Sequence, residues 1–193
     1  MSGPKLLGYS ITSSTAQVEA PFIAVGSRGS ATYIKPANPP FDSYWIVILS
    51  AKNPTQKVKE WLVPGKDNSA VPHGLDSFMS NPDHIFAVVT YGLGSYQVPQ
   101  GDFYDFLVKY GADRELKKLE QVNVLTFSGS YSRVSYVLTG QGGPRVHGKP
   151  SPPSYEAGSV YGNTPAILLM SLESLPDGQP PYGISDTYTF KTR

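Results

Sequence analysis

The sequence predicts an α+β fold, in which a mixed or antiparallel β-sheet carries about three short helices and additional strands lie at both termini. A continuous apolar run at residues 45–49 is typical of a strand that is covered on both faces, and residues 85–91 predict a second buried strand. Between residues 103 and 110 the apolar side chains instead recur every three or four positions, which indicates an amphipathic helix. The 19 glycines and 18 prolines cluster between these segments and therefore predict short elements joined by turns.

The first 40 residues predict strands at the margin of the fold. Residues 16–25 form the first predicted strand, because alternate positions carry Val18, Ala20, Phe22 and Ala24. Pro21 restricts that strand to a sheet edge or a bulge, since proline cannot donate a backbone hydrogen bond. A turn at 26–30, a short strand at 31–34 and a proline-rich connector at 35–41 follow.

Residues 44–91 predict two buried strands and a short helix between them. The strand at 44–51 pairs across the turn at Asn53-Pro54 with a partner at 58–63. The helix carries Leu75, Phe78 and Met79 at helical spacing, and Asn81-Pro82 ends it before the strand at 85–91.

Two helices and two strands are predicted between residues 99 and 139. The first helix starts near Pro99 and stops at Gly111. The second follows its predicted N-cap, Asp113, and turns Leu116 and Leu119 inward. Residues 122–127 and 133–139 then predict a strand pair across a Ser-Gly-Ser turn.

The last part of the chain is rich in glycine and proline at 141–155, which predicts a long connector. Residues 166–173 and 185–190 predict a terminal strand pair. The expected organisation is one globular domain with an N-terminal arm at 1–40, a core at 41–143, and a connector with a C-terminal hairpin at 144–193.

Composition argues against several classes of protein. The 16 Lys and Arg residues nearly balance the 15 Asp and Glu residues and form no run, so we expect no nucleic-acid binding. There is no cysteine, which excludes disulfides and cysteine zinc sites. The amino-terminal residues lack the apolar stretch of a signal peptide, and the apolar runs are too short to span a bilayer. We therefore expect no membrane insertion and a cytoplasmic or particle-associated location.

The order of these elements is similar to that of a known domain. Its corresponding pieces are the strand at 45–49, Leu75 with Phe78, and the segments 88–92, 106–112, 116–120 and 134–143. In this order they resemble the interleukin-like EMT inducer family, also called the PANDER-like domain, over about half of the chain. The chain differs from secreted members in lacking cysteines, and Ser128-Gly129-Ser130 stands where some members have an Arg-Asp pair. The resemblance implies a non-enzymatic interaction or glycan-binding fold.

No catalytic constellation is visible in the sequence. His73, His84 and His147 lie at no metal-ligand spacing from one another or from paired carboxylates. The glycine-containing segment 90–95 follows a strand, but it lacks the lysine and the spacing of a phosphate loop. We therefore expect no enzyme activity, no metal and no cofactor.

A binding site is predicted where the central strands end, because ligands of mixed sheets often bind there. Exposed aromatic and amide side chains in such loops favour sugars or protein partners. The predicted ligand-binding residues are Tyr91, Gly92, Gln97, Gln100, Ser128, Tyr131 and Arg133.

Two functions remain open from the sequence. The first is a non-catalytic binding module for a glycan or a protein partner, with carbohydrate as the specific candidate. The second is a structural subunit of a virion or filament, for which the chain would form homo-oligomers.

Overall fold

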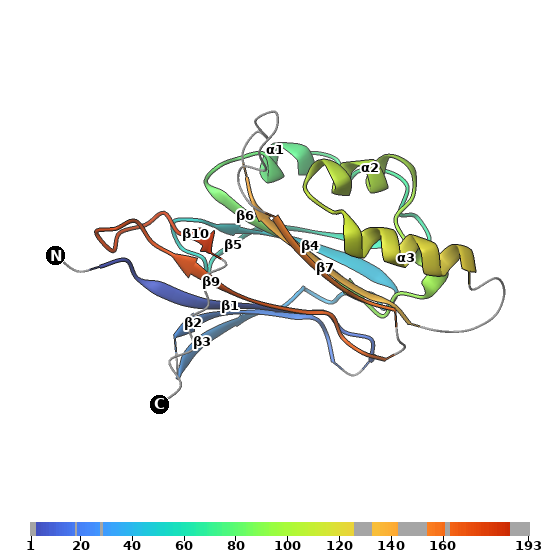
Figure 1. Cartoon of the computed structure of the whole chain (residues 1–193), viewed down its shortest axis with the longest axis horizontal. Helices are drawn as coiled ribbons and strands as arrows, with labels where there is room; N and C mark the ends of the chain where they lie inside the picture. The colour runs from blue at the N-terminus through green and yellow to red at the C-terminus, as the bar shows by residue number, and fades with distance from the viewer. Residues whose placement is uncertain are drawn as a thin grey trace.

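The structure is a computed structural model, and it describes residues 3–17, 19–27, 29–125, 133–142, 154–160 and 163–185. Within these ranges the chain forms two five-stranded antiparallel sheets and three α-helices, which confirms the predicted α+β class. The elements stack in layers: the helices cover one face of a central sheet, and a second sheet covers the other face (Figure 1).

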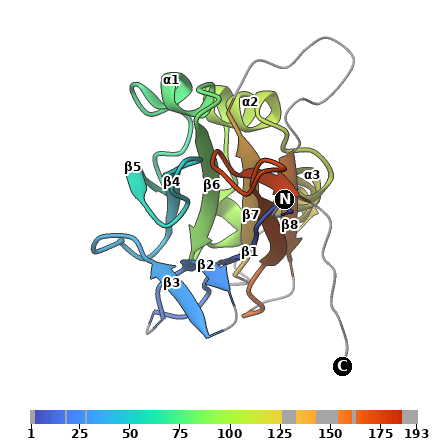
Figure 2. The ribbon, with the colours of Figure 1, turned by 90° about the vertical axis from the view of Figure 1, so that its left-hand side faces the viewer.

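The central sheet is formed by the middle of the chain. Its order is β5 (Lys57–Pro64), β4 (Ser43–Ser50), β6 (His84–Tyr91), β7 (Ser135–Gln141) and β8 (Ser154–Ser159). Figure 2 shows these strands in this order from left to right. The predicted buried strands correspond to β4 and β6, and their antiparallel register places Trp45 opposite Val89. The connector predicted at 141–155 was wrong at its end, because residues from Ser154 onward pair with β7 as β8.

Alternate side chains of β4 and β6 enter different cores. Ile46 and Val88 are fully buried on the helix side, in one cluster with Leu107 of helix α2 (Gly101–Lys109). Trp45 and Val89 are fully buried on the other side, against the second sheet. This two-sided burial explains why the strands are apolar at every position rather than at alternate positions.

The second sheet joins the two ends of the chain. Its order is β10 (Gly183–Ser185), β9 (Ile167–Glu173), β1 (Leu6–Thr12), β2 (Phe22–Ser27) and β3 (Ser30–Ile34). The strand predicted at 16–25 was wrong in its first half, because β1 ends at Thr12 and β2 begins at Phe22. Tyr9 and Ile11 of β1 supply the buried side chains instead. The strand predicted at 185–190 lies, beyond Ser185, outside the described residues.

The helical layer consists of α1 (Leu75–Met79), α2 and α3 (Arg114–Leu125), with a short 3₁₀ turn at Ser95–Gln97 before α2. The strand predicted at 122–127 was wrong, because α3 continues through Leu125. Val122 and Val124 alternate as strand residues do, but they extend a helix that Leu116 and Leu119 anchor in the core. None of the helices in the described ranges combines the length and apolar composition that a bilayer-spanning helix needs.

Gly142, which follows β7, allows two backbone segments to approach closely. Its N–H donates to the carbonyl of His84 at 2.8 Å, and a Cβ at this position would lie 1.6 Å from the carbonyl oxygen of Asn81. We expect Gly142→Ala to lower the free energy of unfolding by about 3 kcal/mol, because main-chain atoms must shift to relieve the clash. Urea denaturation followed by circular dichroism measures this loss.

Gly74 provides the matched control for that substitution. Its φ is +77°, but an added Cβ would meet no atom within 4 Å. Gly74→Ala should therefore cost only about 1 kcal/mol, from backbone strain alone. Equal losses at the two glycines would contradict the close approach at Gly142.

Candidate functional site

The predicted rim residues Tyr91, Gly92 and Arg133 lie together at the end of β6. The Tyr91 hydroxyl donates to the carbonyl of Gln17 at 2.7 Å. The Arg133 guanidinium bonds the Asp42 carboxylate and the carbonyl of Gly92, and it lies 4.6 Å from the ring centroid of Phe41. Phe41 also packs edge-on against Tyr91, with 5.0 Å between the ring centroids. The polar groups of this cluster are therefore engaged with other parts of the same chain.

The two predicted glutamines have different environments. Gln97 is buried in the 3₁₀ turn, where its side-chain oxygen accepts from the N–H of Gly94 at 2.7 Å. The main-chain carbonyl of Gln97 accepts a hydrogen bond from the Tyr44 hydroxyl. Gln100 is exposed and immediately precedes helix α2. The remaining two predicted residues, Ser128 and Tyr131, lie outside the described residues.

A hollow beside this rim is too small for a ligand. It is lined by apolar neighbours of the predicted residues, among them Leu93, Val98 and Val134, and its volume is about 10 Å³. A cavity of that size holds at most one water molecule. The structure thus brings part of the predicted site together, but as a closed and internally bonded cluster.

A larger hollow lies between the central sheet, at the end of β7 and the start of β8, and the second sheet, at the end of β9 and at β10. Its volume is about 460 Å³, within the range of small-molecule sites. The hollow around Thr12 and Asn163 is smaller, about 180 Å³. We call the larger hollow the inter-sheet cleft; it is lined by Gln141, Tyr155, Glu173, Ser174, Leu175, Pro181, Tyr182, Gly183, Ile184 and Ser185.

Hydrogen bonds fix the walls of the inter-sheet cleft. The Tyr182 N–H donates to the carbonyl of Ala51 at 2.8 Å, which ties the segment before β10 to the end of β4. The Gln141 side-chain amide donates to the Tyr182 carbonyl at 3.4 Å, and the Ser174 hydroxyl accepts from the N–H of Lys5 at 2.8 Å. These bonds attach the walls of the cleft to the two sheets that also form the core.

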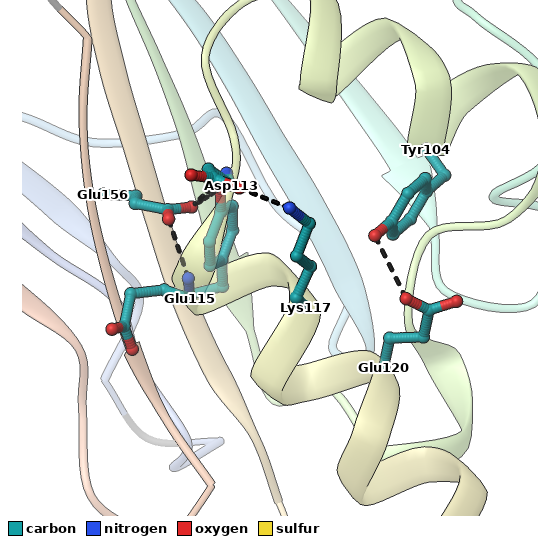
Figure 3. A network of polar contacts seen from close by, with 7 residues as sticks. Tyr104, Asp113, Glu115, Lys117, Glu120 and Glu156 are labelled. Atoms are coloured by element: carbon teal, nitrogen blue, oxygen red, sulfur yellow. Dashed lines mark hydrogen bonds and ion pairs between the residues drawn. The ribbon is translucent and has the colours of Figure 1, made fainter.

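The residue pattern of β8 connects the cleft with the helical layer. Tyr155 packs against the core between the sheets, whereas its neighbour Glu156 reaches the start of α3 (Figure 3). The Glu156 carboxylate accepts from the N–H groups of Glu115 at 2.7 Å and Asp113 at 3.1 Å, and from the Tyr136 hydroxyl at 2.8 Å. A carboxylate is favourable there because the N-terminal N–H groups of a helix lack partners within the helix.

The neighbouring polar contacts of α3 are structural as well. Burial, followed by the negative charge of Glu156, raises the pKa of the Tyr136 phenol well above its ordinary value. Lys117 pairs with Asp113 at 2.6 Å, and the Tyr104 hydroxyl donates to Glu120 at 3.1 Å (Figure 3). Partial burial and then the Glu120 carboxylate raise the pKa of Tyr104 to about 12. Glu156 thus ties the start of α3 to the central sheet, and the Tyr104–Glu120 hydrogen bond joins α3 to α2.

The side chains that line the inter-sheet cleft suit a neutral polar ligand. Tyr155 and Tyr182 supply aromatic rings, and Glu173 and Gln141 supply hydrogen-bonding groups. No Lys, Arg or His is among the described residues that line it. The Glu173 carboxylate has no hydrogen-bond or ion-pair partner in the described part of the chain. The cleft therefore favours hydroxyl donors over anionic groups.

Sequence reasoning missed the cleft because its residues come from segments predicted as a connector and a terminal hairpin. A single carboxylate in the lining gives no pair for acid–base chemistry. Among the described residues, no group of three or more His, Cys, Asp and Glu side chains could hold a metal ion.

No protein-family model matches the sequence, and no curated protein matches it.

Proposed function

We propose that the protein is a non-catalytic binding module whose inter-sheet cleft takes a carbohydrate. The observation that carries this proposal is the composition of the cleft: two tyrosine rings beside a carboxylate and an amide, in a volume of about 460 Å³. Sugar rings present apolar C–H faces that pack on aromatic rings, and hydroxyl groups that donate to carboxylate and amide oxygens. The absence of cations from the described lining favours neutral sugars over phosphorylated or acidic ones.

Kinship with the interleukin-like EMT inducer domain is part of this proposal. It is supported by the succession of β4, β5, α1, β6, α2, α3 and β7, which follows the order of elements that the resemblance implies. The family's non-enzymatic character agrees with a cleft whose described lining contains one carboxylate and no Lys, Arg or His. Binding is then the role of the site.

The experiment is a glycan array of neutral and acidic oligosaccharides, followed by calorimetric titration of the strongest binder. We expect Tyr182→Ala to weaken binding at least about tenfold, since stacking on one ring accounts for roughly 1.4 kcal/mol. Glu173→Gln keeps the shape of the side chain and removes its charge, and it should also weaken binding.

Tyr96→Ala is the matched control, because Tyr96 is 65% exposed and lies at the rim predicted from the sequence. Its affinity should equal that of the unsubstituted protein. Loss of binding with Tyr96→Ala and not with Tyr182→Ala would move the site to the rim. A blank array would reject carbohydrate as the ligand.

A further inference from the structure

The outer face of the second sheet is an exposed apolar surface. Tyr9, Ile11 and Val25 enter the core, so the alternate positions of these strands face away from the molecule. The strand register sets Leu169, Ser10, Ala24 and Tyr33 in one row across β9, β1, β2 and β3. The adjacent row contains Ile167, Thr12 and Phe22.

Large side chains stand on the two sides of this face, and small ones lie between them. Tyr33 is 63% exposed, Leu169 59% and Ile167 49%. The rings of Phe22 and Tyr33 lie 5.8 Å apart and form the aromatic side. Exposed apolar patches that extend over several strands mark interaction surfaces in proteins that are otherwise covered by polar residues.

We propose that two copies of this chain associate through the outer faces of their second sheets. In the described strands, the outward positions of β1, β2 and β3 carry no charge, and Glu173 of β9 lies at the strand end, where it lines the inter-sheet cleft. A charged partner would therefore find no complementary group at these outward strand positions. Another copy is favoured because the net charge of +1 causes little repulsion between copies.

The arrangement of the face is self-complementary. The centre of the row lies between β1 and β2. The aliphatic residues of β9 lie just beyond β1, and Tyr33 of β3 lies just beyond β2, so both are equally far from this centre. A two-fold axis parallel to the strands would place β9 of one copy over β3 of the other. Leu169 of each copy would then contact Tyr33 of its partner. The small residues Ser10 and Ala24 would lie between these two contacts.

The size of the face sets the strength of the contact. Four strands about 4.8 Å apart and about six residues long, at about 3.4 Å per residue, give a planar area of roughly 400 Å² per copy. Standard protein interfaces bury about 800 Å² per partner. We therefore expect a reversible dimer that forms in the micromolar range rather than a permanent one.

Analytical ultracentrifugation from low micromolar to submillimolar concentration tests the proposal. The unsubstituted protein should show a reversible monomer–dimer equilibrium. Leu169→Lys should raise the dimer dissociation constant at least about 100-fold, because a two-fold interface would bury the added ammonium group twice. Tyr33→Lys, on the opposite side of the same face, should have the same effect.

Val124→Lys is the matched control, since it adds the same charge at a residue that is 64% exposed on α3, in the helical layer. It should leave the dissociation constant unchanged, and circular dichroism should show all variants folded. A protein that stays monomeric throughout, or a dimer that tolerates both Leu169→Lys and Tyr33→Lys, overturns the proposal. Leu169→Lys should retain carbohydrate binding, because Leu169 does not line the cleft, so this proposal and the proposed function fail independently.

Discussion

Phe103→Ala should lower the free energy of unfolding by about 3–5 kcal/mol, the usual cost of removing a large aromatic ring from a core. Phe103 of α2 is fully buried, and its ring packs edge-on against Tyr44 of β4 with 5.5 Å between centroids. The substitution leaves a cavity between the helical layer and the central sheet. Urea denaturation, followed by tryptophan fluorescence to which the fully buried Trp45 contributes, measures the loss.

Val108→Ala tests whether the effect belongs to the core and not to the helix. Val108 lies in the same helix but is 37% exposed. Because alanine has the higher helix propensity, we expect a change of no more than about 0.5 kcal/mol. A loss below about 1 kcal/mol for Phe103→Ala would mean that α2 does not pack on the central sheet as described.

Alkaline conditions should destabilise the protein steeply, because Tyr9, Tyr44 and Tyr136 are buried. Burial is the main cause that raises the pKa of each phenol above its ordinary value of 10.0. In the unfolded chain these phenols lose their protons near pH 10, whereas the folded protein retains them. The stabilisation is therefore complete below pH 10 and falls as the pH rises beyond it. Each of these phenols contributes about 1.4 kcal/mol per pH unit to the slope, so the three together contribute about 4 kcal/mol per pH unit.

Urea denaturation at several pH values between 9 and 11 gives this slope, and phenolate absorbance reports when the tyrosines ionise. Tyr136→Phe should reduce the slope by about 1.4 kcal/mol per pH unit, because it removes one phenol that keeps its proton in the folded protein. Tyr96→Phe should leave it unchanged, since Tyr96 is 65% exposed. Ionisation of all tyrosines near pH 10 without unfolding would contradict the burial of these hydroxyls.

The buried centre of the fold could be predicted from the sequence because its residues carry the information locally. A strand covered on both faces must be apolar at every position, which identified β4 and β6. The spacing of Phe103, Phe106 and Leu107 identified α2, and Leu107 does share one core with Ile46 and Val88.

The elements that were missed depend on partners distant in sequence. β8 reads Ser-Tyr-Glu-Ala-Gly-Ser, which has little intrinsic preference for a strand. It becomes one by pairing with β7 and by binding the start of α3 through Glu156. The inter-sheet cleft likewise combines residues from 141 to 185, and only the register of both sheets brings them together.

The pairing of β1 with β9 has a consequence for how the protein is made. Leu7 lies opposite Leu172, and Ile11 opposite Leu168, so partners are separated by most of the chain. Contacts between such distant residues slow folding, since a long loop must close before they form. On the ribosome, one edge of β1 can pair with β2 early, but the other edge stays unpaired until β9 has emerged. Synthesis is therefore the stage at which this chain most needs protection from aggregation.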